Sequence, residues 1–426
     1  MTKTVGVALL GLGTVGGGTY RILRDKHEMI KKTQGLDLKV ECIIERNEAR
    51  IKEMGVDPAI VSTDINDVLK NDNIKVVAEF FGGIEPAKTF LIKCLLAGKS
   101  IVTANKELFS KYWHELEAAA KKGKAGLYFE ASCVGGVPII RTLTDSMQGN
   151  NIRSIKGIIN GTTNYILTKM SNSGMSYAEA LAQAQSLGYA EANPTADVEG
   201  FDASYKISIL SSLAFRRKVP LDKVYREGIT NVSPADIAFG KEMGFVVKLL
   251  AIAKDIDGKT EVRVHPAFVP KDSPLASVSD SFNAVLIEGD AVGDVMLYGR
   301  GAGDLPTGSA IVSDIVVAAS RDKHKLSCFK NDNRHIPAAN FVTDFVSEYY
   351  VRILVKDEVG VLAELTEKFS RYGVSINILA QKEGAGVVPL VFITHKTQES
   401  NVNKALSKIA LLPSVIKIES VIRVER

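Results

Sequence analysis

The sequence has little of several features that mark specialised classes of protein. Its four cysteines form no CxxC pair, which argues against a zinc ribbon or a redox dithiol and fits a reducing cytoplasm. No apolar run reaches the roughly 18 residues that span a bilayer. The net charge is only +4, and no segment has the basic excess of a nucleic-acid-binding domain. We therefore expect a cytoplasmic protein that binds neither membranes nor nucleic acid.

The chain does have length and an ordinary globular composition. Its 426 residues are 46% hydrophobic and 24% charged, which excludes a disordered or collagen-like chain. A chain of this length can bury large cores without covalent crosslinks. At roughly 150 residues per domain, the length predicts about three domains.

Residues 1–130 alternate between strand and helix signals. Such alternation predicts an α/β domain with a doubly wound parallel sheet. Strands are expected from Val5 to Leu9, at Lys39–Ile44, Lys75–Phe81, Ser100–Thr103 and Leu127–Glu130, with helices between most of them.

A glycine-rich turn follows the first of these strands and opens a helix. It reads Gly11-Leu12-Gly13-Thr14-Val15-Gly16. In a GxGxxG turn the first glycine permits the bend, the second lets a pyrophosphate approach, and the third lets helix and strand pack closely. The free N–H groups of the helix would face the phosphates. The motif predicts a Rossmann-type NAD(P)-binding domain; a glycine-rich turn without a ligand is the alternative.

Two charged residues at the end of the second strand bear on the choice of cofactor. Glu45 would bind a ribose 2′-hydroxyl and favour NAD, whereas Arg46 would accept a 2′-phosphate and favour NADP. Either could also be a solvated charge, so the sequence leaves NAD and NADP open.

Residues 131–330 predict a less regular α+β domain, and the polar stretch at 331–347 predicts a linker. Residues 348–426 then restart as a small unit with the order βαββαβ, which is that of a ferredoxin-like fold.

Lysines in unusual places are the candidates for chemistry. Asp202 and Lys206 lie four residues apart on a predicted helix that is apolar almost all round, so we expect both to be buried. A buried lysine beside a carboxylate can exchange protons with a substrate oxygen. Lys106 follows a predicted Asn105 N-cap, where a lysine opposes the helix dipole. The alternatives are a surface ion pair and a solvated lysine.

The segment from Glu130 to Pro138 follows a strand and is rich in glycine. Its exposed carbonyl groups could hold a hard cation. A simple crossover between domains is the other interpretation, and the residues alone favour it.

Seven motifs together resemble the homoserine dehydrogenases that carry a C-terminal ACT domain, and the resemblance covers nearly the whole chain. They are GLGTVG at 11–16, GGIEPA at 82–87, TANKEL at 103–108, EASCVGGVPII at 130–140, NGTTNYIL at 160–167, GYAEANPTADVEGFDASYK at 188–206 and GRGAGDLPTGSAIVSDI at 299–315.

The resemblance implies the reversible NAD(P)H-dependent reduction of L-aspartate 4-semialdehyde to L-homoserine. It assigns Lys206 as the acid, Asp202 as the residue that holds it, and Lys106 to the nicotinamide and substrate. Glu191 would bind the substrate's ammonium group, and Asp197 is a further candidate for substrate contact.

The resemblance also implies cofactor and cation ligands. Gly82 would contact the cofactor, and Gly303, in a segment near 300–325 that returns to the first domain, would close over it. Sodium would be held by the main-chain carbonyls of Glu130, Cys133, Gly135 and Val137, with Cys133 standing where the family usually has valine.

The tail would then be a regulatory ACT domain whose effector is L-threonine. Effector contacts are expected from Asp357, Gly360, Val361, Leu362 and Asn377. A dimerisation module without a ligand is the alternative. Removal of residues 341–426 should leave activity and abolish inhibition by threonine. We expect a homodimer or homotetramer. Two rival functions remain, namely another ACT-containing dehydrogenase and an amino-acid sensor with an inactive Rossmann domain.

Overall fold

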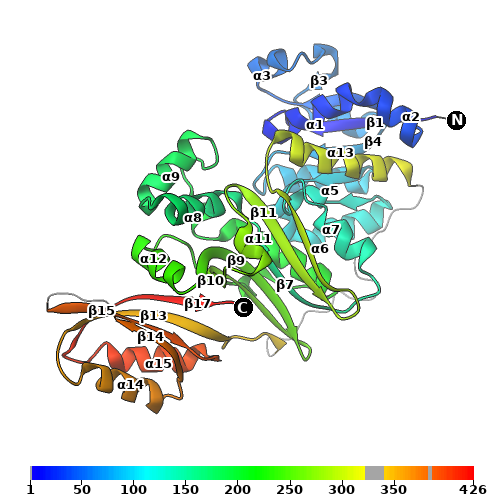
Figure 1. Ribbon diagram of the computed structural model, residues 1–426. Coiled ribbons are helices and arrows are strands. Elements are labelled where there is room, and N and C mark those ends of the chain that lie inside the picture. The colour runs from blue at the N-terminus through cyan, green and yellow to red at the C-terminus, as the bar shows by residue number, and fades with distance from the viewer. Residues whose placement is uncertain (1, 322–339, 382–385) are drawn as a thin grey trace. The chain divides into compact units, whose positions relative to one another are not determined.

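The computed structural model describes residues 2–321, 340–381 and 386–426, which form two compact units (Figure 1). Within these ranges, the first unit contains residues 2–161, 202–224 and 282–321. The second contains residues 162–201, 225–281, 340–381 and 386–426. Each unit is therefore assembled from segments that lie far apart in the sequence.

A six-stranded parallel sheet forms the centre of the first unit, in the order β3-β2-β1-β4-β5-β6. This confirms the predicted Rossmann-type sheet. The strand order reverses between β1 and β4, and in open α/β sheets ligands bind beyond the carboxyl ends of the strands at such a point. The strands are β1 (Lys3–Leu10), β2 (Leu36–Ile44), β3 (Val61–Ser62), β4 (Ile74–Glu79), β5 (Ser100–Thr103) and β6 (Leu127–Tyr128).

The central strand is buried on both faces, as parallel strands covered by helices are. All six residues from Val5 to Leu10 are buried, and alternate ones belong to the core cluster that also contains Ile311 and Ile315 of α13 (Asp304–Ser320). The other helices near this sheet are α1 (Thr14–Asp25), α2 (His27–Gln34), α3 (Glu48–Glu53), α4 (Ile65–Lys70), α5 (Ala87–Leu96) and α6 (Lys106–Gly123).

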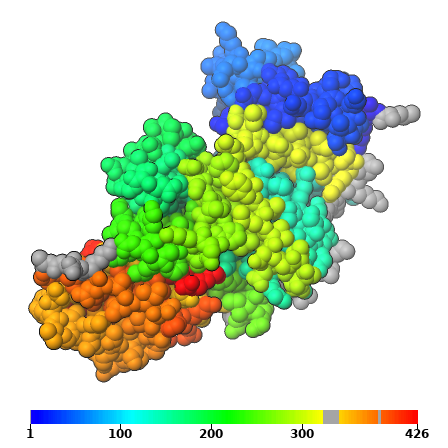
Figure 2. Space-filling view, in the orientation of Figure 1, coloured from blue at the N-terminus to red at the C-terminus, as the bar shows by residue number. Residues whose placement is uncertain are grey.

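Helix α13 returns to the first domain from far along the chain and packs along α1. In Figure 2 its yellow atoms lie against the blue atoms of the N-terminal segment. The approach is close, because a Cβ on Gly18 would lie 2.2 Å from the carbonyl oxygen of Asp304. The remaining elements of this unit are α7 (Ile139–Arg141), nearly all of α11 (Phe201–Ala214), and the antiparallel strands β7 (Ile152–Ile158), β11 (Phe282–Gly289) and β12 (Gly293–Arg300).

The second unit joins part of the predicted α+β region to the tail. The long strands β9 (Phe245–Ile256) and β10 (Lys259–Pro270) form an antiparallel pair. The helices are α8 (Gly161–Ser173), which starts at the border of the unit, α9 (Tyr177–Ser186), α10 (Thr195–Val198) and α12 (Pro234–Glu242), and the short strand β8 (Tyr225–Arg226) pairs with β10.

The tail has the predicted βαββαβ order, with one additional two-residue strand, and so confirms the ferredoxin-like fold. Its own core is formed by one face of the sheet and two helices. Its elements are β13 (Val346–Lys356), α14 (Val361–Arg371), β14 (Ile376–Gln381), β15 (Val387–Thr394), β16 (Thr397–Gln398), α15 (Glu399–Ile409) and β17 (Val415–Val424).

The tail sheet continues into β10. The end of β17 pairs in parallel with that strand, with Arg423 opposite Ala267 and Val424 opposite Phe268. Of the expected linker at 331–347, residues 331–339 lie outside the described residues, and Phe341 forms a bridge with Thr260.

Candidate active site

The glycine turn at the end of β1 has the geometry that its motif predicts. Gly11 has a φ of +105°, a region that favours glycine. A Cβ on Gly16 would lie 2.2 Å from the carbonyl oxygen of Gly11, so the helix can begin this close to the strand only with glycine there. Gly13, the N-cap of α1, has open space around its Cβ position, and Thr14 is exposed. The start of α1 therefore leaves room for a pyrophosphate next to its first N–H groups.

Glu45 and Arg46, at the end of β2, differ in what they contact. The Glu45 carboxylate accepts hydrogen bonds from the N–H groups of Leu12 (2.7 Å), Arg46 (2.8 Å) and Asn47 (3.0 Å). Burial alone would raise the pKa of Glu45, but these N–H donors outweigh it and lower the pKa. The Arg46 side chain is exposed. The carboxylate is thus turned toward the glycine turn, while the arginine remains accessible.

Lys106 is the first residue of α6, and the predicted N-cap before it is confirmed. The Asn105 side chain accepts a hydrogen bond from the N–H of Leu108 at 3.0 Å. Gly82 lies in the exposed loop after β4, with a φ of +70°. Both residues therefore follow the carboxyl ends of neighbouring strands, at the edge that carries the glycine turn.

The centre of the site is one buried carboxylate that binds two lysines. Asp202 Oδ1 lies 2.8 Å from Lys106 Nζ, and Oδ2 lies 2.6 Å from Lys206 Nζ. Helix α11 is buried almost all round, as its apolar pattern predicted. The side chains of Asp202 and Lys206 are 6% and 9% exposed, whereas that of Lys106 is 41% exposed.

Electrostatics keep the Asp202 carboxylate ionised. Burial alone would raise the pKa of Asp202, but the two ammonium groups overcome this and hold the pKa well below its ordinary value. Lys206 Nζ also donates to the carbonyl oxygen of Ile159 at 2.7 Å. Within the described part of the chain, these two contacts are the hydrogen bonds of the ammonium group, so one of its three N–H donors is left for a substrate oxygen.

Asn160 is a residue of this site that we did not predict. Its amide nitrogen donates to Asp202 Oδ2 at 2.9 Å, so that oxygen accepts from both Asn160 and Lys206. The residue opens the NGTTNYIL motif and lies two positions after the end of β7. That position was the available signal, since a polar residue at a strand end often faces a site.

Two predicted substrate-binding residues, Glu191 and Asp197, belong to the second unit. Glu191 is exposed in the loop before α10, and its carbonyl oxygen accepts a hydrogen bond from Gln185 at 3.0 Å. Asp197 is half-buried in the first turn of α10. Their roles toward a substrate stay predictions.

Gly303 is the N-cap of α13 and has a φ of +123°. The residue after it, Asp304, forms an ion pair with Arg21 of α1. The returning segment is therefore bound to the helix that follows the glycine turn, and the contact of Gly303 with a cofactor stays a prediction.

The loop from Glu130 to Pro138 is shaped by its main chain. Val134 and Gly135 both have left-handed backbone conformations, with φ of +55° and +48°. The Glu130 carboxylate accepts hydrogen bonds from the N–H groups of Ile140 (2.8 Å) and Arg141 (2.9 Å). Both carboxylate oxygens thus accept main-chain hydrogen bonds, and the sodium ligands that the family resemblance implies are main-chain carbonyls of this loop.

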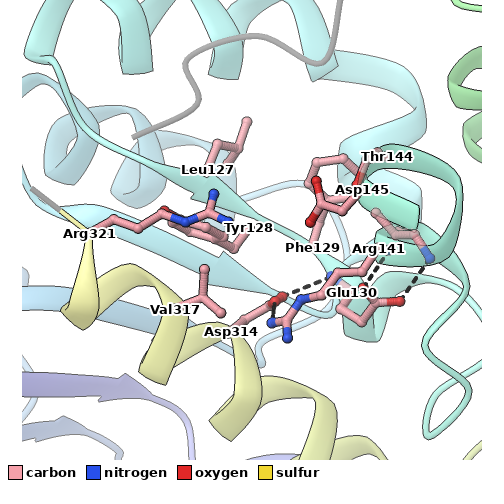
Figure 3. A pocket seen from close by; sticks show the side chains of 11 residues that line it. Leu127, Tyr128, Phe129, Glu130, Arg141, Thr144, Asp145, Asp314, Val317 and Arg321 are labelled. Atoms are coloured by element: carbon pink, nitrogen blue, oxygen red, sulfur yellow. Dashed lines mark hydrogen bonds and ion pairs between the residues drawn. The ribbon is translucent and has the colours of Figure 1, made fainter. Parts of the chain in front are cut away.

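A cavity of about 300 Å³ adjoins this loop. In Figure 3, Arg141 and Asp314 meet on one side of it and Arg321 extends along another. The Asp314 carboxylate pairs with Arg141 and also accepts the N–H of Glu130 at 2.9 Å. Burial and the neighbouring Asp314 raise the pKa of Glu130 to about 7. Of the charged residues that line the cavity, Arg141 thus forms ion pairs with both Asp314 and Glu130.

In the tail, four predicted effector residues, Asp357, Gly360, Val361 and Leu362, lie at or just before the start of α14, whereas Asn377 lies on β14 level with Ile393 of β15, at the end of the sheet away from Lys356. Gly360 is the N-cap, with a φ of +96°. Val361 is buried, whereas Asp357, Leu362 and, on β14, Asn377 are exposed.

Two features are absent from the described residues, namely a cluster of metal-ligating side chains and a membrane-spanning helix. Residues 2–321, 340–381 and 386–426 bring together no three His, Cys, Asp or Glu side chains that could hold a metal ion. Among the same residues, every helix is too short or too polar to cross a membrane.

Comparisons with known proteins agree on one family. Family models match at residues 11–130 (homoserine dehydrogenase, NAD binding domain), 138–316 (homoserine dehydrogenase) and 349–411 (ACT domain). The homoserine dehydrogenase of Corynebacterium glutamicum is 41% identical over 430 residues, which cover 100% of this chain and 96% of the relative.

Solved structures give the same result. A homoserine dehydrogenase from Thiobacillus denitrificans superposes with a TM-score of 0.92 and 37% identity, over 99% of this chain and 98% of the other. A hyperthermophilic archaeal homoserine dehydrogenase in complex with NADPH gives a TM-score of 0.64 and 29% identity, over 74% of this chain and 98% of the other.

Proposed function

The chain belongs to the homoserine dehydrogenase family, and on that premise we propose that Asp202, Lys206 and Lys106 carry out its reaction. The enzyme is an NAD(P)-dependent oxidoreductase with an ACT domain. The substrates of the proposed reaction are L-aspartate 4-semialdehyde and L-homoserine. One observation carries the proposal: a buried carboxylate holds two lysines in the unit that contains the glycine turn.

The protein residues supply position and a proton. When bound, NAD(P)H supplies the hydride. Lys206 donates a proton to the oxygen that becomes negative, and accepts one in the reverse direction. Asp202 binds and orients that ammonium group, while Asn160 fixes the carboxylate. Lys106 adds positive charge on the more exposed side of the cluster.

For the cofactor we propose a preference for NADP over NAD. The Glu45 carboxylate already accepts three N–H groups, which reduces its capacity to bind a ribose hydroxyl. Arg46 is exposed, and Arg50 bonds the carbonyl oxygen of Leu12 at 2.9 Å through Nε. Two guanidinium groups near the adenosine end of the site suit a 2′-phosphate.

The remaining assignments rest on the resemblance. Glu191 would bind the substrate's ammonium group, and Asp197 is a further candidate for substrate contact. Sodium would be held by the carbonyls of Glu130, Cys133, Gly135 and Val137. L-threonine would bind at the start of α14 as a feedback effector, and the enzyme would be a homodimer or homotetramer.

The rival dehydrogenase class needs a catalytic histidine with a carboxylate partner. The structure does pair His27 with Asp37 at 2.8 Å. Asp37, however, is the second residue of β2, and the amino ends of parallel strands lie at the edge opposite the glycine turn. This pair therefore supports an anchoring role for α2 and not a role in the reaction.

One assay tests the proposed function and the sensor alternative together. The enzyme is mixed with L-homoserine and either NADP⁺ or NAD⁺, with and without L-threonine, and absorbance at 340 nm is followed. Reduction of NADP⁺ faster than NAD⁺ supports the proposal, and slowing by threonine supports the effector assignment. No change with either cofactor would favour the sensor.

A further inference from the structure

Glu79 is a fully buried carboxyl group at the carboxyl end of β4. It lies opposite Leu10 of β1 on one side and Thr103 of β5 on the other, and its exposed fraction is 0%. This position is next to the reversal of strand order, where open α/β sheets bind their ligands. Burial of a carboxyl group is costly unless it is hydrogen-bonded, so its contacts call for an explanation.

Those contacts link two loops. One Glu79 oxygen accepts the N–H of Phe81 at 2.8 Å, and the other accepts the hydroxyl of Thr103 at 2.6 Å. The Thr103 oxygen in turn accepts the N–H of Asn105 at 3.0 Å. The Asn105 side chain donates to the carbonyl oxygen of Gly83 at 2.7 Å, which closes the network. This network thus fixes the loop after β4 and the start of α6 to each other through the buried Glu79 side chain.

The network ends one residue before the proposed site. Asn105 also caps α6, and Lys106 is the next residue, with its Nζ 2.8 Å from Asp202. Gly82, the predicted cofactor contact, lies between Phe81 and Gly83, both of which the network holds.

We propose that Glu79 is a positioning residue for the reduction. It acts through Thr103 and Asn105 to hold Lys106 against Asp202, and through Phe81 to fix the loop that would carry the nicotinamide. The proposal rests on the function proposed above and extends it to a residue that touches neither substrate nor cofactor.

Four variants test it. Glu79→Gln keeps the shape but replaces one accepting oxygen with an N–H donor. Thr103→Val removes the hydroxyl donor, and Thr103→Ser retains it. Glu117→Gln is the matched control, because Glu117 is also buried in this unit but lies on α6 away from the strand ends.

We expect Glu79→Gln and Thr103→Val to lower kcat by on the order of 10- to 100-fold and to weaken NADPH binding, since small displacements of positioned groups can cost 100-fold. Thr103→Ser and Glu117→Gln should stay near wild type. The measurements are kcat and KM per folded molecule, the NADPH Kd by fluorescence, and Tm.

A folded Glu79→Gln enzyme with wild-type kcat and NADPH affinity would overturn the proposal. The same holds if the Tm of that enzyme is lower but its kcat and NADPH Kd are unchanged. If Glu79→Gln does not fold, the comparison of Thr103→Val with Thr103→Ser decides. If the wild-type enzyme does not oxidise homoserine, the proposed function fails, and the NADPH Kd values still test the effect of Glu79 on the loop.

Discussion

Lys106 and Lys206 bind opposite oxygens of a single buried carboxylate, that of Asp202, at 2.8 and 2.6 Å. One lysine comes from the start of α6, and the other lies one helical turn after the aspartate on α11. The more buried of the two retains a free N–H direction for a substrate oxygen. This asymmetry is the reason to assign the proton transfer to Lys206 and a supporting charge to Lys106.

Replacement of Lys206 should abolish most turnover and leave the fold intact. We expect Lys206→Ala to lower kcat by on the order of 10²–10⁴-fold, the usual contribution of a general acid. The fold should survive because Asp202 would still bind Lys106 and Asn160. Steady-state kinetics and Tm provide the check, with the exposed Lys122→Ala as the control. A variant with near wild-type kcat would remove Lys206 from the mechanism.

Arg46 should determine the choice between cofactors. In Arg46→Ala we expect KM for NADPH to rise about 10- to 100-fold, because hydrogen bonds to charged groups contribute about 1.5–3 kcal/mol. KM for NADH should change less than twofold. The exposed Lys52→Ala on α3 controls for a general loss of positive charge. Equal changes in both KM values would show that Arg46 does not contact the 2′-phosphate.

How far the sequence could predict this site depends on how local each contact is. The Asp202–Lys206 pair could be predicted because residues four positions apart on a helix lie on the same face. The glycine turn could be predicted because its spacing follows from backbone geometry. Asn160 lies 42 positions before Asp202, and Glu79 lies 24 before Thr103. Neither contact follows from periodicity, since each depends on how strands and helices pack.

The elements of the fold also differ in whether local sequence or tertiary contacts determine them. Strands with clear apolar runs, such as β1 and β5, were predicted nearly to the residue. The strand β9 was missed, because Phe245–Ile256 is an apolar run whose length suits a helix as well as a strand. Its identity depends on pairing with β10, which is a tertiary contact.

Lys248 on β9 should make stability depend on pH in the alkaline range. Its side chain is buried and bonds Asn164 and the carbonyl oxygen of Val278. Burial lowers the pKa of Lys248 to about 8. Between pH 8 and the ordinary lysine pKa of about 10.4, the Lys248 side chain is protonated in the unfolded chain and neutral in the folded protein. The free energy of unfolding therefore rises with pH over this range, and the gain is lost as the pH falls back to 8.

The test compares Tm between about pH 7.5 and pH 10 in wild type and Lys248→Met. The free energy of unfolding of wild type relative to the variant should rise by at most about 3 kcal/mol over this range. The exposed Lys259→Met serves as the control. Parallel Tm curves for wild type and Lys248→Met would contradict the prediction.

The C-terminal strand should be needed for stability as well as regulation. Arg263 of β10 is fully buried, and its guanidinium bonds Glu261 at 2.9 Å and Glu425 at 3.0 Å. Loss of one partner from a buried ion pair costs about 3–5 kcal/mol. We therefore expect Glu425→Ala to lower Tm by several degrees, whereas Glu367→Ala, which breaks an exposed pair with Arg371, should cost under about 1 kcal/mol.

Deletion of residues 341–426 should have the larger effect. It would remove Glu425 together with β17, which pairs with β10, and would leave that strand with an open edge. The structure therefore gives a reason to expect a destabilised or aggregating protein in place of an active enzyme that has only lost its effector response. Thermal melts and size-exclusion chromatography of the truncated protein provide the measurement. A monodisperse truncated enzyme with wild-type Tm and kcat would show that the catalytic part folds without the tail.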